Sequence, residues 1–117
     1  MSVLIVDDDE DIRDLLSLIL RLEGHEVQLA VDGVDALARL SSHRPSVILL
    51  DMMMPRLDGE GFLKELRNNP QLADIPVVLI SGHQAARQKA AELGVAGCLV
   101  KPIELTDLLS TLNRIGG

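Results

Sequence analysis

Short apolar runs alternate along the chain with longer segments in which apolar residues recur at helical spacing. The runs are rich in β-branched residues and lie at residues 3–6, 27–31, 47–50, 77–80 and 98–100. Helical spacing of i, i+3, i+4 and i+7 is clearest at Ile12, Leu15, Leu16 and Ile19, and again at Leu105, Leu108, Leu109 and Leu112. The pattern therefore predicts five strands that alternate with helices.

Three weaker helical segments complete the alternation. They are marked by Val34, Leu37 and Ala38, by Phe62, Leu63 and Leu66, and by Ala86, Ala90 and Leu93. Gly24 and Gly94 stand where helix C-caps are expected. Five β–α units with short connections imply a doubly wound α/β domain with a five-stranded parallel sheet.

The second strand differs from the strands around it. Residues 3–6, 47–50 and 77–80 are apolar throughout, as in strands buried on both faces. In residues 27–31, by contrast, Val27, Leu29 and Val31 alternate with Gln28 and Ala30. The second strand is therefore predicted at an edge of the sheet. This position fits the strand order 2-1-3-4-5, with the switch point between strands one and three.

Length and charge exclude several classes of protein. The 117 residues carry a net charge of −7, with 47% hydrophobic and 25% charged residues, which is typical of a single globular domain without a separate substrate domain. The acidic excess argues against a domain that reads nucleic acid directly. A single cysteine, Cys98, and an N-terminus without signal-peptide features favour a cytoplasmic protein. No apolar stretch approaches the ~20 residues of a membrane span.

Polar residues follow the predicted strands at four places. Strand one is followed by Asp7 and Asp8, strand three by Asp51, strand four by Ser81 and strand five by Lys101. Because the carboxyl ends of parallel strands share one edge of a sheet, these side chains are expected to meet in one crevice, where α/β sheets bind ligands.

The charges in that crevice point to a metal ion. Like charges ~4 Å apart repel by ~4 kcal/mol at an effective dielectric constant of ~20, and a divalent cation would relieve this repulsion among the aspartates. Oxygen ligands suit Mg²⁺, with Mn²⁺ as the alternative. Asp51, ionised at neutral pH, is the candidate nucleophile toward a phosphoryl group, whose oxygens Ser81 and Lys101 would bind.

Four segments in this order closely resemble the receiver domain of bacterial two-component response regulators, in particular the single-domain chemotaxis-type regulators. They are residues 4–9 (LIVDDD), 49–59 (LLDMMMPRLDG), 78–82 (VLISG) and 101–102 (KP). The resemblance covers essentially the whole chain and implies a flavodoxin-like (βα)5 fold. By this resemblance, residues 1–117 are expected to form a single receiver domain, with no output domain on this chain.

The resemblance also implies a function. Asp51 would accept a phosphoryl group from the phosphohistidine of a histidine kinase or a histidine phosphotransfer protein. Asp8, Asp51 and the backbone carbonyl of Met53 would bind Mg²⁺, with Asp7 acting through water. Ser81 and Lys101 would contact the phosphoryl group, and the Lys101–Pro102 peptide would be cis. The domain would then be a regulator that catalyses its own phosphotransfer and dephosphorylation and switches the binding of a downstream protein.

Three positions depart from the family pattern. Many receivers have Tyr or Phe three residues before the lysine as a rotamer switch, and this chain has Cys98 there. Cys98 is expected to be a small, partly buried apolar residue. Met53 and His83 stand two residues after Asp51 and Ser81, beside the expected path of hydrolytic water, and we predict that they give the aspartyl phosphate an unusual lifetime.

Other functions fit the residues less well. Asp9, Glu10 and Asp11 are interpreted as a solvated helix start. The alternation of Asp7, Asp9 and Asp11 does not mark an EF-hand loop, which would need Gly in place of Ile12 and Glu in place of Leu18. A pseudo-receiver that acts only as an interaction module is the main alternative. A Mg²⁺-dependent hydrolase of the haloacid dehalogenase type needs Asp at the position of Met53. A flavin carrier needs a phosphate loop, which residues 7–11 would repel.

Overall fold

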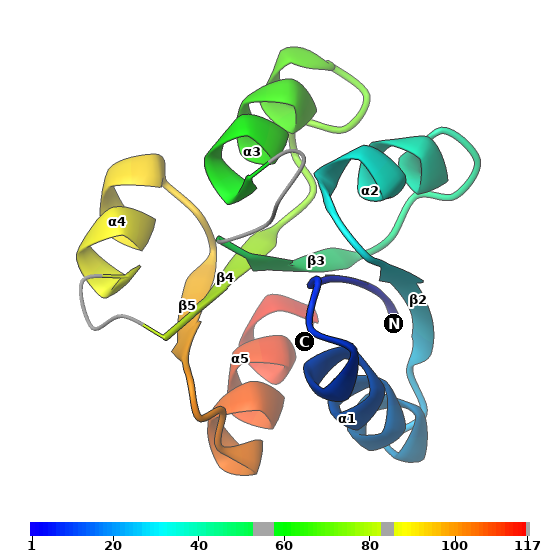
Figure 1. Ribbon diagram of the computed structural model, residues 1–117, viewed down its shortest axis with the longest axis vertical. Helices are drawn as coiled ribbons and strands as arrows, with labels where there is room; N and C mark the ends of the chain where they lie inside the picture. The colour runs from blue at the N-terminus through cyan, green and yellow to red at the C-terminus, as the bar shows by residue number, and fades with distance from the viewer. Residues whose placement is uncertain (53–57, 83–85, 117) are drawn as a thin grey trace.

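The computed structural model describes residues 1–52, 58–82 and 86–116, in which strands and helices alternate from end to end (Figure 1). The strands are β1 (Ser2–Val6), β2 (Glu26–Ala30), β3 (Val47–Asp51), β4 (Val77–Ser81) and β5 (Gly97–Val100). The helices are α1 (Glu10–Leu22), α2 (Gly33–Leu40), α3 (Gly59–Asn68), α4 (Ala86–Leu93) and α5 (Leu105–Gly116).

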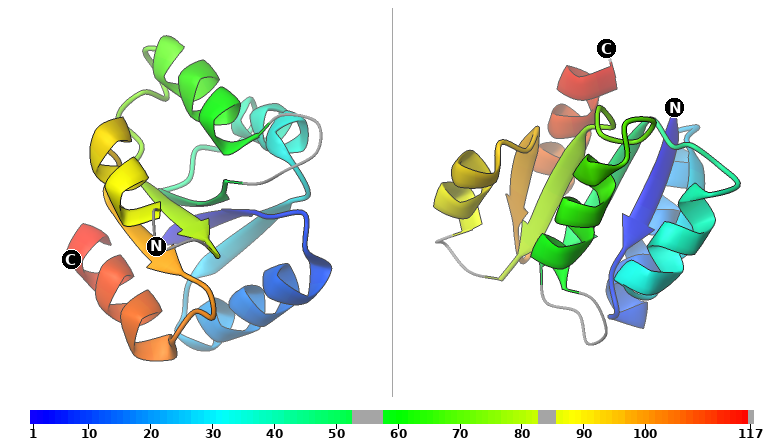
Figure 2. Two further views of the ribbon diagram at one scale, coloured as in Figure 1. Left: turned by 60° about the vertical axis from the view of Figure 1, so that its left-hand side comes forward. Right: turned by 90° about the horizontal axis from the view of Figure 1, so that it is seen from above.

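The strands form one parallel sheet in the order β2-β1-β3-β4-β5. Helices α1 and α5 cover one face, and α2, α3 and α4 cover the other (Figures 1 and 2). Both the doubly wound fold and the predicted strand order are confirmed. The second strand lies at an edge, and its burial is correspondingly lower than that of β1, β3 and β4.

Alternating strand residues divide the core into two apolar clusters. Leu4, Val6, Ile48, Leu50 and Leu79 face α2, α3 and α4, where Phe62 and Leu66 meet them. Their neighbours on the same strands, Val3, Ile5, Leu49, Val78 and Ile80, face α1 and α5 and pack with Leu16, Leu20, Leu108 and Leu112. The central strands must therefore be apolar on both faces, which explains their unbroken apolar sequence.

The inward faces of two helices differ from the sequence pattern. Leu15 is 54% exposed although it shares the helical spacing of Ile12, Leu16 and Ile19, and Leu20 is buried in the core instead. In α2 the buried residues include Ala36 and Leu40, while Val34 is 45% exposed. These helices carry more apolar residues than the sheet can cover, so spacing alone does not identify the face that is buried.

Helix ends follow the local signals of the sequence. Gly24 and Gly94 have φ of +87° and +66°, the left-handed conformation that favours glycine at a helix end. Asp9 caps α1, and its carboxylate accepts hydrogen bonds from the backbone N–H groups of Asp11 and Ile12. The run after Asp8 therefore starts a helix, as predicted.

Two further expectations can be compared with the described residues. The Lys101–Pro102 peptide is cis, as the family resemblance implied. None of the helices in the described part of the chain combines the length and apolar character needed to cross a bilayer.

Candidate functional site

Strand alternation accounts for the different burial of the two aspartates after β1. Val3 and Ile5 face α1 and α5, and continuing the alternation places Asp7 under the same helices, where it is 0% exposed. Asp8 has the opposite parity and is exposed at the edge of the sheet. Asp51, the last residue of β3, has the parity of Leu49 and is 4% exposed.

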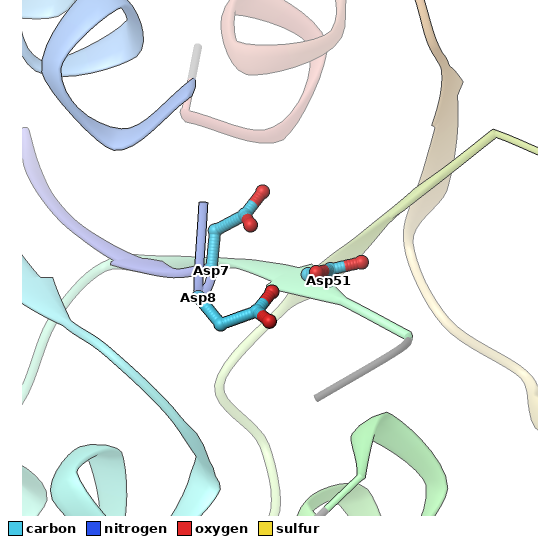
Figure 3. Close-up of side chains that lie close together, drawn as sticks. All are labelled: Asp7, Asp8 and Asp51. Atoms are coloured by element: carbon cyan, nitrogen blue, oxygen red, sulfur yellow. The ribbon is translucent and has the colours of Figure 1, made fainter. Parts of the chain in front are cut away.

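The three aspartates meet at the carboxyl ends of β1 and β3, as predicted. Each of Asp7, Asp8 and Asp51 offers a carboxylate oxygen, and these oxygens lie within 4.8 Å of one another (Figure 3). Lys101, just beyond β5, brings its Nζ to 3.6 Å from Oδ2 of Asp7 and to 4.0 Å from Oδ1 of Asp51. Residues 94 positions apart in sequence thus form one cluster of charges.

The two oxygens of Asp7 have different surroundings. Oδ1 accepts a hydrogen bond of 2.9 Å from the backbone N–H of Asp9. Oδ2 is buried and has no hydrogen-bond partner among the described residues, and the Lys101 ammonium at 3.6 Å is too far for a strong one. A buried carboxylate oxygen without a donor is costly, and a cation would satisfy it. The donor set, made of carboxylate oxygens beside an exposed edge, fits a hard ion such as Mg²⁺.

Arg13 is a member of this region that the sequence pattern did not reveal. It is the fourth residue of α1 and is half-buried, and its Nη1 donates a hydrogen bond of 2.8 Å to the backbone carbonyl of Asp7. No short sequence motif predicts such a bond, because an arginine at this position of a helix is ordinarily a surface charge.

Gly59 allows the end of β3 to pack closely against the start of α3. A Cβ at this position would lie 2.8 Å from the backbone Cα of Met52 and 3.0 Å from the carbonyl oxygen of Asp51. The Gly59 N–H donates to the carbonyl of Met52, and the Asp58 side chain caps α3 by accepting from the N–H of Gly61. Gly59 therefore holds the start of α3 close to the end of β3, and Asp58 caps that helix.

Ser81 ends β4 at the same edge of the sheet as Asp51 and is 7% exposed. Its strand pairs with β3 and β5 in parallel register, so it lies between the strand that ends in Asp51 and the strand that precedes Lys101. Met53 and His83 lie outside the described residues. The predicted metal contact of the Met53 carbonyl, and the predicted effect of both residues on phosphoryl lifetime, remain predictions.

Cys98 is half-buried and packs against the core cluster on the α4 side of β5, as expected of a small apolar residue. Burial raises the pKa of the Cys98 thiol, and the positive charge of Arg87 opposes this shift only in part. A groove of about 370 Å³ lies beside it between α4 and α5, with Arg87 and Arg114 among its lining residues. The position that holds an aromatic ring in many receivers therefore contributes little side-chain volume here.

Comparison with known proteins gives consistent matches across the chain. Residues 3–113 match the family model of the response regulator receiver domain. The response regulator MprA of Mycobacterium avium (strain 104) is 37% identical over 117 residues, which cover 98% of this chain and 50% of the relative. The chain thus spans about half the length of the curated relatives it matches.

Solved structures agree with the sequence matches. The chemotaxis protein CheY4 of Vibrio cholerae superposes with a TM-score of 0.89 at 36% identity, covering 97% of each chain. The receiver domain of NtrX from Brucella abortus superposes with a TM-score of 0.88 at 37% identity, covering 97% of this chain and 96% of the other. The parallel sheet order and the acidic cluster therefore occur within an architecture that these proteins share.

Proposed function

This chain belongs to the response regulator receiver domain family, and from that premise we propose that Asp51 is its phosphoacceptor. The observation that carries the proposal is the convergence of Asp7, Asp8 and Asp51 within 4.8 Å, with Lys101 reaching two of them. Asp51 ends the central strand β3, beside the switch point of the sheet, where α/β domains bind their ligands.

The proposed reaction transfers a phosphoryl group from a phosphohistidine to Asp51. A carboxylate oxygen of Asp51 attacks phosphorus, a P–O bond forms as the P–N bond breaks, and the released imidazole nitrogen takes a proton from water. A carboxylate nucleophile has no proton to lose as it attacks, so this step needs no general base. The aspartyl phosphate is later lost when water attacks phosphorus and restores the carboxylate.

The other residues of the site hold charge in place. Asp7, Asp8 and Asp51, with the carbonyl of Met53, would hold Mg²⁺, which when bound offsets the negative charge of the phosphoryl oxygens. Lys101 already lies near Asp7 and Asp51 and would bind one phosphoryl oxygen. The hydroxyl of Ser81 at the end of β4 would donate a hydrogen bond to another.

The proposed donor is a sensor histidine kinase or a histidine phosphotransfer protein, which would phosphorylate this chain in the cytoplasm. The proposed output is altered binding of a downstream protein partner. Residues 1–117 would act in this exchange as a single receiver domain. Cys98 cannot serve as an aromatic rotamer switch, so Ser81 must communicate with the partner through backbone movement or another side chain.

Intact-mass measurement tests the phosphoacceptor directly. Wild type incubated with acetyl phosphate and Mg²⁺ should gain one phosphoryl group, and the gain should disappear in Asp51→Asn and in the presence of a chelator. Wild type that gains no mass, and that shows no Mg²⁺-dependent response to beryllofluoride by NMR, would favour a pseudo-receiver. Continuous turnover of many small phosphate esters would instead favour a hydrolase.

A further inference from the structure

The segment Asp7–Asp8–Asp9 is held by two hydrogen bonds that involve the two peptide groups flanking Asp8. The preceding peptide is held through its carbonyl, that of Asp7, which accepts a bond of 2.8 Å from Nη1 of Arg13. The following peptide is held through its N–H, that of Asp9, which donates a hydrogen bond of 2.9 Å to Oδ1 of Asp7. Both peptide planes beside Asp8 are therefore fixed by side chains.

Asp8 is exposed, whereas Asp7 and Asp51 are buried. Packing therefore restrains the carboxylates of Asp7 and Asp51, but the direction of the Asp8 side chain depends on its backbone. Rotation of the Asp7–Asp8 peptide would move the Asp8 carboxylate away from the other two. Of the two bonds that oppose this rotation, the bond from Asp9 lies within the turn itself, and the bond from Arg13 ties the turn to the body of α1.

We propose that Arg13 is a positioning residue that sets the Mg²⁺ affinity of the site by fixing the Asp7–Asp8 peptide and thereby the Asp8 carboxylate. The inference rests on the proposed function, since it takes Asp8 to be a metal ligand. Arg13 acts through the backbone and touches neither the phosphoryl group nor the metal. Loss of groups that orient metal ligands lowers metal affinity by about 10- to 100-fold in other metal sites.

The opposite result is expected if Arg13 acts only through its charge. A guanidinium near the acidic cluster repels Mg²⁺, so its removal would tighten metal binding. Positioning and repulsion thus predict opposite directions for the same variant, which makes the measurement decisive. Arg21 provides a matched control, because it lies on the same helix and its Nη2 also donates to a backbone carbonyl, that of Val27, at 3.4 Å.

The experiment is a calorimetric Mg²⁺ titration of the whole chain as wild type, Arg13→Ala, Arg13→Lys and Arg21→Ala. We expect Arg13→Ala to raise the Mg²⁺ dissociation constant by about tenfold, at the low end of the range for such groups. Arg13→Lys, which keeps the charge and one donor, should fall between Arg13→Ala and wild type. Arg21→Ala should bind Mg²⁺ as wild type does.

Two further readouts separate positioning from a general loss of structure. In metal-free protein, Arg13→Ala should shift the NMR amide signals of Asp8 and Asp9 while its urea midpoint stays close to that of Arg21→Ala. The Mg²⁺ concentration for half-maximal phosphorylation by acetyl phosphate should rise about tenfold, in step with the dissociation constant, while the rate at saturating Mg²⁺ stays unchanged.

The possible failures are distinguishable. If Arg13→Ala binds Mg²⁺ as tightly as wild type or more tightly, the role of Arg13 is overturned and the proposed phosphoacceptor stands. If Arg13→Lys binds Mg²⁺ as weakly as Arg13→Ala in a folded protein, the retained charge does not restore the affinity, which supports a role for the hydrogen bond from Nη1 over a role for the charge. If wild type shows no saturable Mg²⁺ binding that Asp51→Asn weakens, the metal site of the proposed function fails, and this inference fails with it.

Discussion

Val6 and Asp7 are adjacent in the chain and both are 0% exposed, yet they belong to regions with opposite energetic roles. Val6 packs in the apolar cluster beneath α2, α3 and α4, where burial stabilises the fold. Asp7 is buried beside Asp51, with one oxygen lacking a hydrogen bond among the described residues. The strand interiors stabilise the domain, whereas the buried carboxylates at the carboxyl edge reduce its stability and form the proposed metal and phosphoryl site.

The largest effect is expected in the strand interior. Leu50 is 0% exposed, and Leu50→Ala should lower the free energy of unfolding by about 3 kcal/mol, from lost burial and the cavity left behind. Urea denaturation followed by circular dichroism measures the change. Leu22, which is 77% exposed, is the matched control, and Leu22→Ala should change stability by less than about 0.5 kcal/mol. Equal effects of the two variants would contradict the assignment of the core.

Metal addition should reverse the cost of the carboxyl edge. An ion that binds only the folded state at 100 times its dissociation constant stabilises by about 2.7 kcal/mol. We therefore expect the urea midpoint of wild type to rise with Mg²⁺, with an added stability of about 2.7 kcal/mol when Mg²⁺ is at 100 times its dissociation constant, and the rise to be much smaller in Asp51→Asn. A midpoint that is insensitive to Mg²⁺ would show that the acidic cluster is not a metal site.

Removing one buried charge should help the metal-free fold. Asp7→Asn keeps an oxygen to accept from the Asp9 N–H and removes one of the like charges near Asp51. Its lost attraction to Lys101, at 3.6 Å, offsets only part of the gain. With a chelator present, we expect the variant to be about 1 kcal/mol more stable than wild type in urea denaturation. Phosphorylation by acetyl phosphate should fall at the same time, and a less stable variant would contradict the proposed energetic role of Asp7.

The smallest effect concerns an exposed pair far from both regions. The Arg44 guanidinium donates a hydrogen bond of 2.9 Å to the Asp74 carboxylate, and this bond, followed by the positive charge of Arg44, lowers the pKa of Asp74. Because the folded pKa lies below the unfolded one, the stabilisation is present above the unfolded pKa and disappears as the pH falls through the folded pKa. Arg44→Ala should return the pKa of Asp74 to its ordinary value in an NMR titration. An unchanged pKa would show that the pair does not persist in solution.

Sequence patterns predicted the strands and their order because residues 3–6, 47–50 and 77–80 must be apolar on both faces to be buried. They also predicted that Asp7, Asp8 and Asp51 would meet, since parallel strands end at one edge. The spacing did not identify the inward face of α1, since Leu15 shares the spacing of Leu16 and is exposed; that helix has apolar residues on more than one face.

Other features could not be derived from the sequence pattern alone. The bond from Arg13 to the Asp7 carbonyl joins a side chain to a backbone group, and nothing in the pattern distinguishes such an arginine from a solvated one. The difference in exposure between Asp7 and Asp8 required strand parity together with the position of α1 and α5. Periodicity thus specifies which elements form, whereas the detailed contacts at the ends of the elements depend on their three-dimensional packing.

The most direct test of the central claim is to find which residue carries the phosphoryl group. Borohydride reduces an acyl phosphate to an alcohol, so protein treated with acetyl phosphate and Mg²⁺ and then reduced should contain homoserine at position 51, as detected by peptide mass mapping. The conversion should be absent when Mg²⁺ is omitted. Reduction at a different aspartate, or at none in protein that binds Mg²⁺, would contradict the assignment of Asp51 as the phosphoacceptor.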